Sequence, residues 1–226
     1  MDRVGIHRKP ETLVQDISIS EKQMVEIAKA LAANARIIIM DEPTSSLSVD
    51  ETENLFKIIR QLKEDGADYV VCILHWGKEL VYSPTEDQVE IAHRCVEAGA
   101  DLIYGSHSHC LQPIEEYKGG IILYSMGNWV FGGSTAPSDM DTAIVQIHVK
   151  RETDGSIRND GYTVIPCCVS RRPVQEGYTG DNYNDYCPIP YPEGSEDYYR
   201  VLAKLDGTFV PDSEGRDYSD VYAQYS

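Results

Sequence analysis

Short apolar runs alternate with amphipathic segments along the first part of the chain. The runs at 69–74 and 101–105 have the length and composition of buried strands. Residues 49–64 repeat apolar side chains every three or four positions, which is the period of a helix. Thr85 and Gln88 form the capping-box pattern that opens another helix before 101–105. This alternation predicts a parallel sheet built from βαβ units.

After residue 120 the pattern changes to that of β-strands. The segments IILYS, NWVF, TAIVQIHV and YTVIP are separated by turn sequences such as ETDGS, which favours antiparallel pairing. From Arg171 the chain is rich in Tyr, Asp and Gly, and we expect a wrapping tail with one helix over EDYYRVLAKL. The predicted fold class is therefore α/β, with a parallel βαβ core and an antiparallel portion after residue 120.

Three histidines follow the two predicted strands. His107 and His109 belong to the sequence GSHSH after 101–105, and His75 follows the run 69–74. Residues two positions apart in an extended segment point to the same side, so both imidazoles of GSHSH can reach one site. Three neutral imidazoles are a normal partial ligand set for zinc, manganese or iron. The alternative is that His75 packs in the core while the other two line a polar loop.

The segments around these histidines carry a family resemblance. They read DYVVCILHWGKEL, EAGADLIYGSHSHCLQPIEEYKGGIILYSMGNWVFGG and VIPCCVS. They closely resemble the bacterial CapA/PgsA family of capsule and poly-γ-glutamate synthesis proteins, from about residue 62 to about residue 205. The resemblance implies a metallophosphoesterase-like fold in which His75, His107 and His109 form the C-terminal half of a metal site. It also implies that Asn128 lies near this site; a turn asparagine is the alternative.

The chemistry implied by the resemblance is metal-activated water attacking a phosphate ester. The family's N-terminal ligand motifs, an early Asp/His strand motif, a Gly-Asp strand end and an Asn-His turn, are absent from this sequence. Three histidines without a bridging carboxylate favour a mononuclear site or no bound metal. The implied partners are the cell-envelope polymer synthesis machinery, because relatives of this kind are envelope-associated.

A different family is resembled by residues 13–66. This segment looks like the ATPase subunit of a sugar-type ABC importer, from its signature motif through its Walker B strand at 36–40. The resemblance implies that Ser18 belongs to the signature loop, that Asp41 holds Mg²⁺ through water and that Glu42 polarises the attacking water. The phosphate-cradling G-x-x-x-x-G-K-[ST] loop is absent, so we expect neither Mg-ATP binding nor ATP hydrolysis.

The two resemblances meet near residues 62–68. They divide the chain into an ABC-ATPase-like segment at 1–66, a CapA-like region at 67–170 and an acidic, Tyr-rich tail at 171–226. We expect the first segment to share a sheet with the second, because about fifty residues bury too little apolar area for a separate core. Three functions remain open: a metal-dependent phosphoesterase-like hydrolase, a nucleotide-binding remnant that associates with ABC transporter subunits, and an inactive fusion product.

Charge and composition limit the possible partners and the cellular location of the protein. The formal net charge is −17, and nucleic acids and anionic membranes repel such a protein, so neither is expected as a partner. No stretch has the length of a transmembrane helix, and the N-terminal sequence MDRVGIHRKPETL lacks the apolar core of a signal peptide. The chain as written therefore predicts a cytoplasmic location. The six cysteines contain no C-x-x-C zinc pattern, and we expect reduced thiols.

Overall fold

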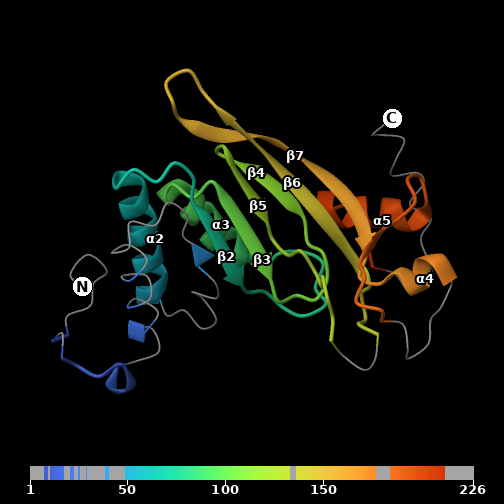
Figure 1. The fold of residues 1–226 in the computed structure, drawn as a ribbon, viewed down its shortest axis with the longest axis horizontal. Coiled ribbons are helices and arrows are strands. Elements are labelled where there is room, and N and C mark those ends of the chain that lie inside the picture. The colour runs from blue at the N-terminus through green and yellow to red at the C-terminus, as the bar shows by residue number, and fades with distance from the viewer. Residues whose placement is uncertain are drawn as a thin grey trace.

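The fold places two β-sheets and the helices that cover them around two apolar cores (Figure 1). A computed structural model of the chain describes residues 8–9, 11–17, 21–22, 25, 29, 39–40, 49–132, 136–176 and 184–211. The first sheet has the strand order β1-β2-β3-β5-β4 and the second has the order β6-β7-β8. This arrangement of a largely parallel sheet and an antiparallel one confirms the predicted α/β class.

The first sheet carries the histidines at its edge. Its parallel strands are β1 (Ile39–Met40), β2 (Val71–His75), β3 (Leu102–Ser106) and β5 (Gly120–Leu123), and β4 (Ile114–Tyr117) runs antiparallel to β5. Because neighbouring parallel strands end at the same edge of a sheet, the residues that follow β2 and β3 meet there.

Two helices cover one face of this sheet. They are α2 (Val49–Glu64) and α3 (Glu86–Ala98). Helix α3 begins with the predicted capping box, in which Thr85 and Gln88 exchange side chain to backbone hydrogen bonds. It ends at Gly99, whose φ of 116° fits a glycine C-cap. The core between helices and sheet includes Phe56 and Ile59 of α2, which are fully buried.

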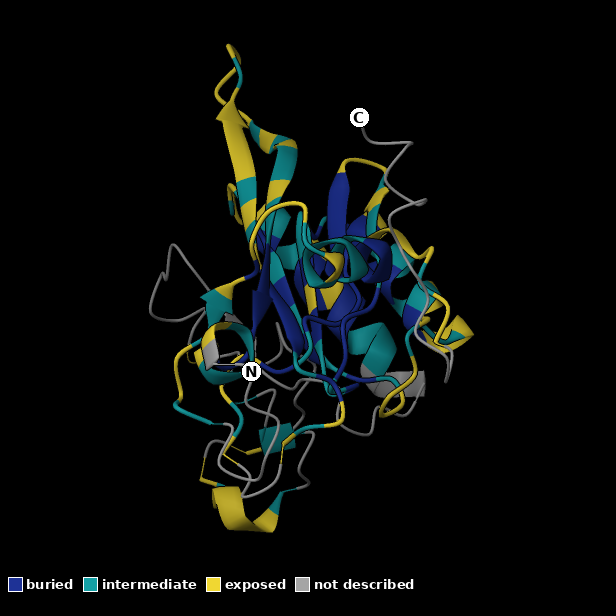
Figure 2. Ribbon diagram, turned by 90° about the vertical axis from the view of Figure 1, so that its right-hand side faces the viewer, coloured by how far each residue is buried: buried dark blue, intermediate teal, exposed yellow. Residues whose placement is uncertain are grey.

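The second sheet packs over the opposite face. It consists of β6 (Asp141–Arg151), β7 (Ile157–Cys168) and β8 (Ile189–Pro190), all antiparallel. The alternation of side chains along β5 shows the two layers, since Ile122 lies in the core under the helices while Ile121 and Leu123 lie in the core under the second sheet. The buried residues concentrate between these layers, whereas the end of the β6–β7 hairpin projects beyond them and is exposed (Figure 2).

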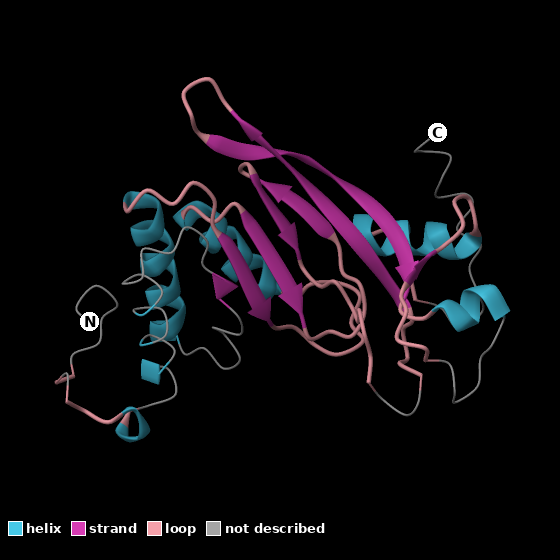
Figure 3. Ribbon diagram, viewed as in Figure 1, coloured by secondary structure: helices cyan, strands magenta, loops and turns pink. Residues whose placement is uncertain are grey.

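The C-terminal part folds back on the second sheet. The short helix α4 (Arg171–Glu176) follows β7, and α5 (Glu196–Asp206) is the helix predicted in the tail (Figure 3). Lys204 of α5 is buried and donates hydrogen bonds to both Asp139 and Asp141 at the start of β6. Arg200, also of α5, donates to the two carboxylate oxygens of Asp141. Buried ion pairs of this kind fix the helix to the sheet.

The strand pairing tests the expected position of the N-terminal segment. Met40 pairs with Cys72 in parallel, so the segment before residue 66 shares the first sheet, as predicted. Positions 21, 22, 25 and 29 of the predicted helix 20–33 are helical, and its other residues lie outside the described part of the chain, as do residues 36–38 of the predicted strand 36–40. None of the described helices is long and apolar enough to cross a membrane.

Three local expectations were wrong. The segment NWVF, predicted as a strand, has no strand structure at Asn128 to Phe131, because Gly127 turns the chain with a φ of 65°. Strand β4 was not predicted, since its sequence IEEY lacks a clear apolar pattern. The strand β2, expected to be buried on both faces, is fully buried only at alternate residues. The second sheet covers β3, β4 and β5, but no residue of β2 belongs to its core.

Candidate functional site

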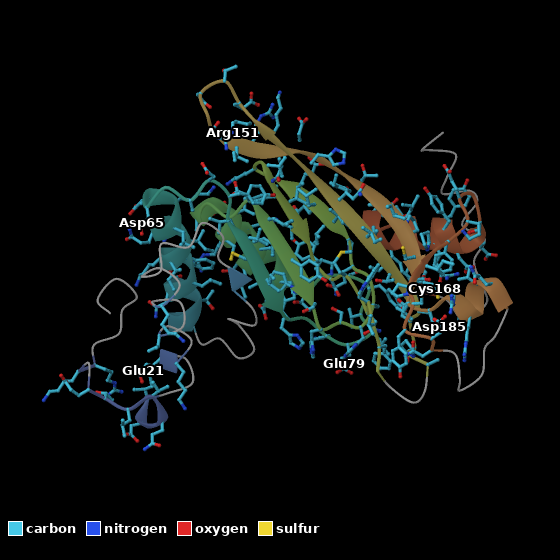
Figure 4. The ribbon with its side chains drawn as sticks, in the orientation of Figure 1. Glu21, Asp65, Glu79, Arg151, Cys168 and Asp185 are labelled. Atoms are coloured by element: carbon cyan, nitrogen blue, oxygen red, sulfur yellow. The ribbon has the colours of Figure 1, made fainter. Side chains whose placement is uncertain are left out.

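The three predicted histidines gather at the carboxyl ends of β2 and β3. His75 is the last residue of β2 and pairs in register with Ser106, the last residue of β3. The ring centroids of His75 and His107 are 4.5 Å apart, and those of His107 and His109 are 6.3 Å apart. In the same region of the molecule, the exposed Glu79 marks the loop after β2 (Figure 4). The sheet edge therefore brings three imidazoles within the reach of one another.

The turn that carries two of these histidines has an unusual backbone. His107 has a φ of 101° and His109 a φ of 55°, values that residues with a Cβ rarely adopt. Ser108 between them is fully buried, and its hydroxyl has no hydrogen-bond partner among the described residues. Backbone strain together with an unsatisfied buried polar atom is characteristic of functional sites. The tight turn keeps both imidazoles at the strand end instead of continuing the strand.

Asn128 contacts this turn directly. Its Oδ1 lies 2.8 Å from Nδ1 of His109, and its Nδ2 donates to the backbone carbonyl of His109 at 3.2 Å. The residue is buried. The ring of Phe131 meets the imidazole of His109 edge to face at 6.1 Å. The structure thus places Asn128 beside the candidate site through two hydrogen bonds to one histidine.

The sequence did not reveal how the end of β2 is held in place. The indole N–H of Trp76 donates to the backbone carbonyl of Tyr124 at 2.9 Å, which links the residue after His75 to the end of β5. The link passes over Gly105 of β3, where a Cβ atom would lie 1.9 Å from the Tyr124 oxygen. A side chain at this position would therefore block the contact. The HWG sequence carries the only signal for it, since Trp is rarely buried without a partner for its N–H.

A buried amide pair supports the loop after β2. Gln88 donates from Nε2 to Oε1 of Gln112 at 3.0 Å, and Gln112 donates in turn to the carbonyls of Val81 and Ser83. The backbone N–H of Leu80 donates to the carbonyl of Ser108. These bonds hold the loop against the histidine turn. The capping box located Gln88, but nothing in the sequence indicated its pairing with Gln112.

Other polar residues near the histidines have different roles. Glu115 contacts Nε2 of His93 at 3.0 Å and accepts from the Tyr124 hydroxyl, so its carboxylate is engaged away from the three clustered histidines. Cys110 donates to the carbonyl of Val81. Burial, with a contribution from Asp139, raises the pKa of its thiol to about 12, which disfavours the thiolate that metals bind.

A pocket of about 380 Å³ borders the HWG segment. It is lined by Trp76–Lys78, by the first turn of α3 from Thr85 to Gln88 and by Ile91. Glu86 and Asp87 in that turn place negative charge at its wall. Lys78 adds a positive charge to the same lining, so the pocket carries charges of both signs.

The histidines fit a metal in donor type more than in arrangement. Within the described part of the chain, no group of three or more His, Cys, Asp and Glu side chains is arranged to hold a metal ion. The three imidazoles are nevertheless neighbours, with ring centroids 4.5 Å apart for His75 and His107 and 6.3 Å apart for His107 and His109. The nucleotide-binding residues predicted from the N-terminal segment, Ser18, Asp41 and Glu42, lie outside the described residues.

Comparison with known proteins identifies the family. The family model described as bacterial capsule synthesis protein PGA_cap matches residues 10–133, which is more than half of the chain. The chain belongs to this capsule synthesis family. The match includes the β2 and β3 ends with all three histidines and Asn128. It also begins well before residue 62, where the resemblance seen in the sequence was expected to start.

The chain is similar to known proteins of two different kinds. The chain is 44% identical over 89 residues to the PGA biosynthesis protein CapA of Bacillus subtilis, covering 39% of this chain and 23% of that protein. It is 40% identical over 118 residues to the capsule biosynthesis protein CapA of Bacillus anthracis, covering 51% and 28%. It is also 51% identical over 78 residues to the ribose import ATP-binding protein RbsA 1 of Streptomyces avermitilis, covering 34% and 15%. The chain thus spans less than a third of the length of each of these relatives.

Proposed function

We propose that this protein is a CapA-like capsule or poly-γ-glutamate biosynthesis protein with a partial, mononuclear metal site that hydrolyses a phosphoester. His75, His107 and His109 would bind one divalent ion, either manganese, zinc or iron. The observation that carries the proposal is the meeting of these three imidazoles at one sheet edge, in a chain of the capsule synthesis family. By the same family membership, we expect it to act with the cell-envelope polymer synthesis machinery.

In this proposal some residues of the chain would bind the metal ion and others would orient its ligands. The three imidazoles supply nitrogen ligands. Asn128 orients the ring of His109 through its contact with Nδ1. A bound divalent metal would supply an activated water and positive charge for the phosphoryl oxygens. That positive charge matters here because the chain as a whole is strongly acidic and repels anionic substrates.

Elemental analysis of the purified protein tests the assignment. We expect the parent chain to retain close to one manganese, zinc or iron ion after dialysis, and the His107→Ala/His109→Ala double variant to lose it. His148→Ala is the matched control, because His148 lies on β6 and its Nε2 contacts the Thr163 hydroxyl at 2.8 Å, apart from the cluster. Equal metal content in the parent and the double variant would contradict the assignment.

A second candidate follows from the similarity to ribose import ATP-binding proteins. In that case the chain would be a nucleotide-binding remnant that associates with ABC transporter subunits. The sequence contains no G-x-x-x-x-G-K-[ST] loop to hold the β- and γ-phosphates of ATP, so this candidate is the weaker of the two. Steady ATP hydrolysis that disappears in Glu42→Gln would favour it over the hydrolase.

A further inference from the structure

We propose that Asn128 is a positioning residue that fixes the tautomer of His109 and leaves Nε2 as its only nitrogen with a free lone pair. This inference rests on the proposed function, since it names which atom of His109 would face a ligand. It goes beyond that function because the tautomer is a property of the chain itself. It can be measured without metal or substrate.

The orientation of the Asn128 amide follows from its second hydrogen bond. The backbone carbonyl of His109 can only accept, so the atom of Asn128 that lies 3.2 Å from it must be the donor Nδ2. The other end of the amide is then Oδ1, an acceptor, at 2.8 Å from Nδ1 of His109. An acceptor at that distance requires Nδ1 to carry the proton. Reversing the amide would set the acceptor Oδ1 against the carbonyl oxygen of His109, two acceptors 3.2 Å apart.

The protein holds Asn128 firmly in this place. The preceding Gly127 makes a backbone bridge to Thr142 at the start of β6, and its N–H donates to the hydroxyl of Ser125. The hydroxyl of Ser125 in turn donates at 2.8 Å to the backbone carbonyl of Cys110, the residue that follows His109. Asn128 is only 8% exposed, so water competes little for its amide. The amide is therefore positioned before any ligand arrives.

The chemical consequence concerns the free nitrogen. A neutral imidazole has one protonated ring nitrogen and one with a lone pair, and in water it exchanges between the two forms. With Nδ1 fixed as the donor, Nε2 is permanently the nitrogen that can bind a metal or accept a proton. Partners that orient a metal-binding histidine in this way typically change metal affinity about 10–100-fold when they are removed.

Nitrogen NMR of the metal-free protein tests the tautomer. At a pH where the imidazoles are neutral, long-range ¹H–¹⁵N correlation spectra should show His109 protonated at Nδ1, with its signals assigned by their loss in His109→Gln. In Asn128→Leu the proton should move to Nε2 or exchange between the nitrogens. In Asn128→Asp, which keeps an acceptor opposite Nδ1, the Nδ1–H form should persist. Zinc affinity should fall about 10–100-fold in Asn128→Leu.

The matched control is Asn159→Leu. Asn159 also makes several side-chain hydrogen bonds, accepting from the Tyr69 hydroxyl and donating to the carbonyls of Asp101 and Gly119, but it lies on β7. Its loss should destabilise the fold and leave the His109 tautomer unchanged. Protonation of Nε2 in the parent, or an unchanged tautomer in Asn128→Leu, would overturn the inference. The Nδ1–H form without any metal binding would instead contradict the proposed function and support the role of Asn128.

Discussion

At Gly105, strand β3 lies close to the chain just beyond β5. A Cβ atom here would lie 1.9 Å from the Tyr124 carbonyl oxygen and 2.5 Å from the Trp76 indole nitrogen. We expect Gly105→Ala to lower the free energy of unfolding by about 1–3 kcal/mol, as overpacking typically does. Urea denaturation of the variant measures this loss.

The control for Gly105→Ala is Gly132→Ala, because a Cβ at Gly132 meets no atom of the described residues within 4 Å. It should leave the unfolding midpoint nearly unchanged. If both variants unfolded at the same urea concentration as the parent, the close approach of β3 to Tyr124 would be wrong.

For single residues, the sequence indicates which side chains gather at the candidate site better than it indicates their backbone conformation and hydrogen bonds. The spacing of His107 and His109 was expected to present both imidazoles from an extended segment, and the structure instead gives both residues a positive φ. Sequence periodicity carries no information on such a turn. The shape of the turn depends on contacts with distant residues, such as the hydrogen bond from the Leu80 N–H to the Ser108 carbonyl. The two bonds from Asn128 were also beyond reach, since they join residues nineteen positions apart.

Among the elements, helix α5 depends on buried charge for its attachment. Burial alone would raise the pKa of Asp141, but hydrogen bonds and charge from Arg200 and Lys204 outweigh it and hold the pKa below its usual range. A carboxyl with a lowered pKa stabilises the fold above its unfolded pKa, and this contribution is lost as the pH falls through the folded value. We therefore expect the free energy of unfolding to drop below about pH 4, close to the unfolded pKa of Asp.

Substitution of the two carboxyls separates their contributions. Asp141→Asn should flatten the acid loss of stability and cost about 3–5 kcal/mol near neutral pH, because it breaks a buried ion pair. Asp139→Asn should steepen the acid loss, since burial raises the pKa of Asp139 and its contribution has the opposite sign. Chemical denaturation across pH 2–7 measures both. Parallel pH profiles in the two variants would rule out this account.

The elements themselves were predictable where local signals were strong. The capping box at Thr85 correctly predicted the start of α3. Strand NWVF failed because its apolar residues are used in a loop, with Trp129 and Val130 exposed and Phe131 against His109. Apolar composition alone does not distinguish a strand from a loop that covers a site.

In the whole molecule, α2 belongs to the main core although its sequence resembles a different family. Its side chains in that core are Leu55, Phe56, Ile58, Ile59 and Leu62. Burial of each contributes about 1.5–3 kcal/mol, so together they rival the stability of an ordinary domain, about 5–15 kcal/mol. We expect the fragment 67–226 to lose cooperative unfolding and to bind an apolar dye.

The fragment 49–226, which keeps α2, is the control and should unfold in one transition. The same sharp transition in both fragments would show that the CapA-like region folds independently of the ABC-like segment. The sequence predicted the shared sheet, because a short connection joins 49–64 to the next strand. It did not predict how the second sheet packs over β3, β4 and β5, because such contacts join distant parts of the chain.

The hydrogen bond to Tyr124 holds a fluorescent side chain, Trp76, in a buried position. The chain has two tryptophans, and each directly follows a residue of the candidate site: Trp76 follows His75, and Trp129 follows Asn128. One is buried and the other is 45% exposed, so their emission differs in wavelength and in access to quenchers. Intrinsic fluorescence therefore reports on the surroundings of His75 and of Asn128 without any label.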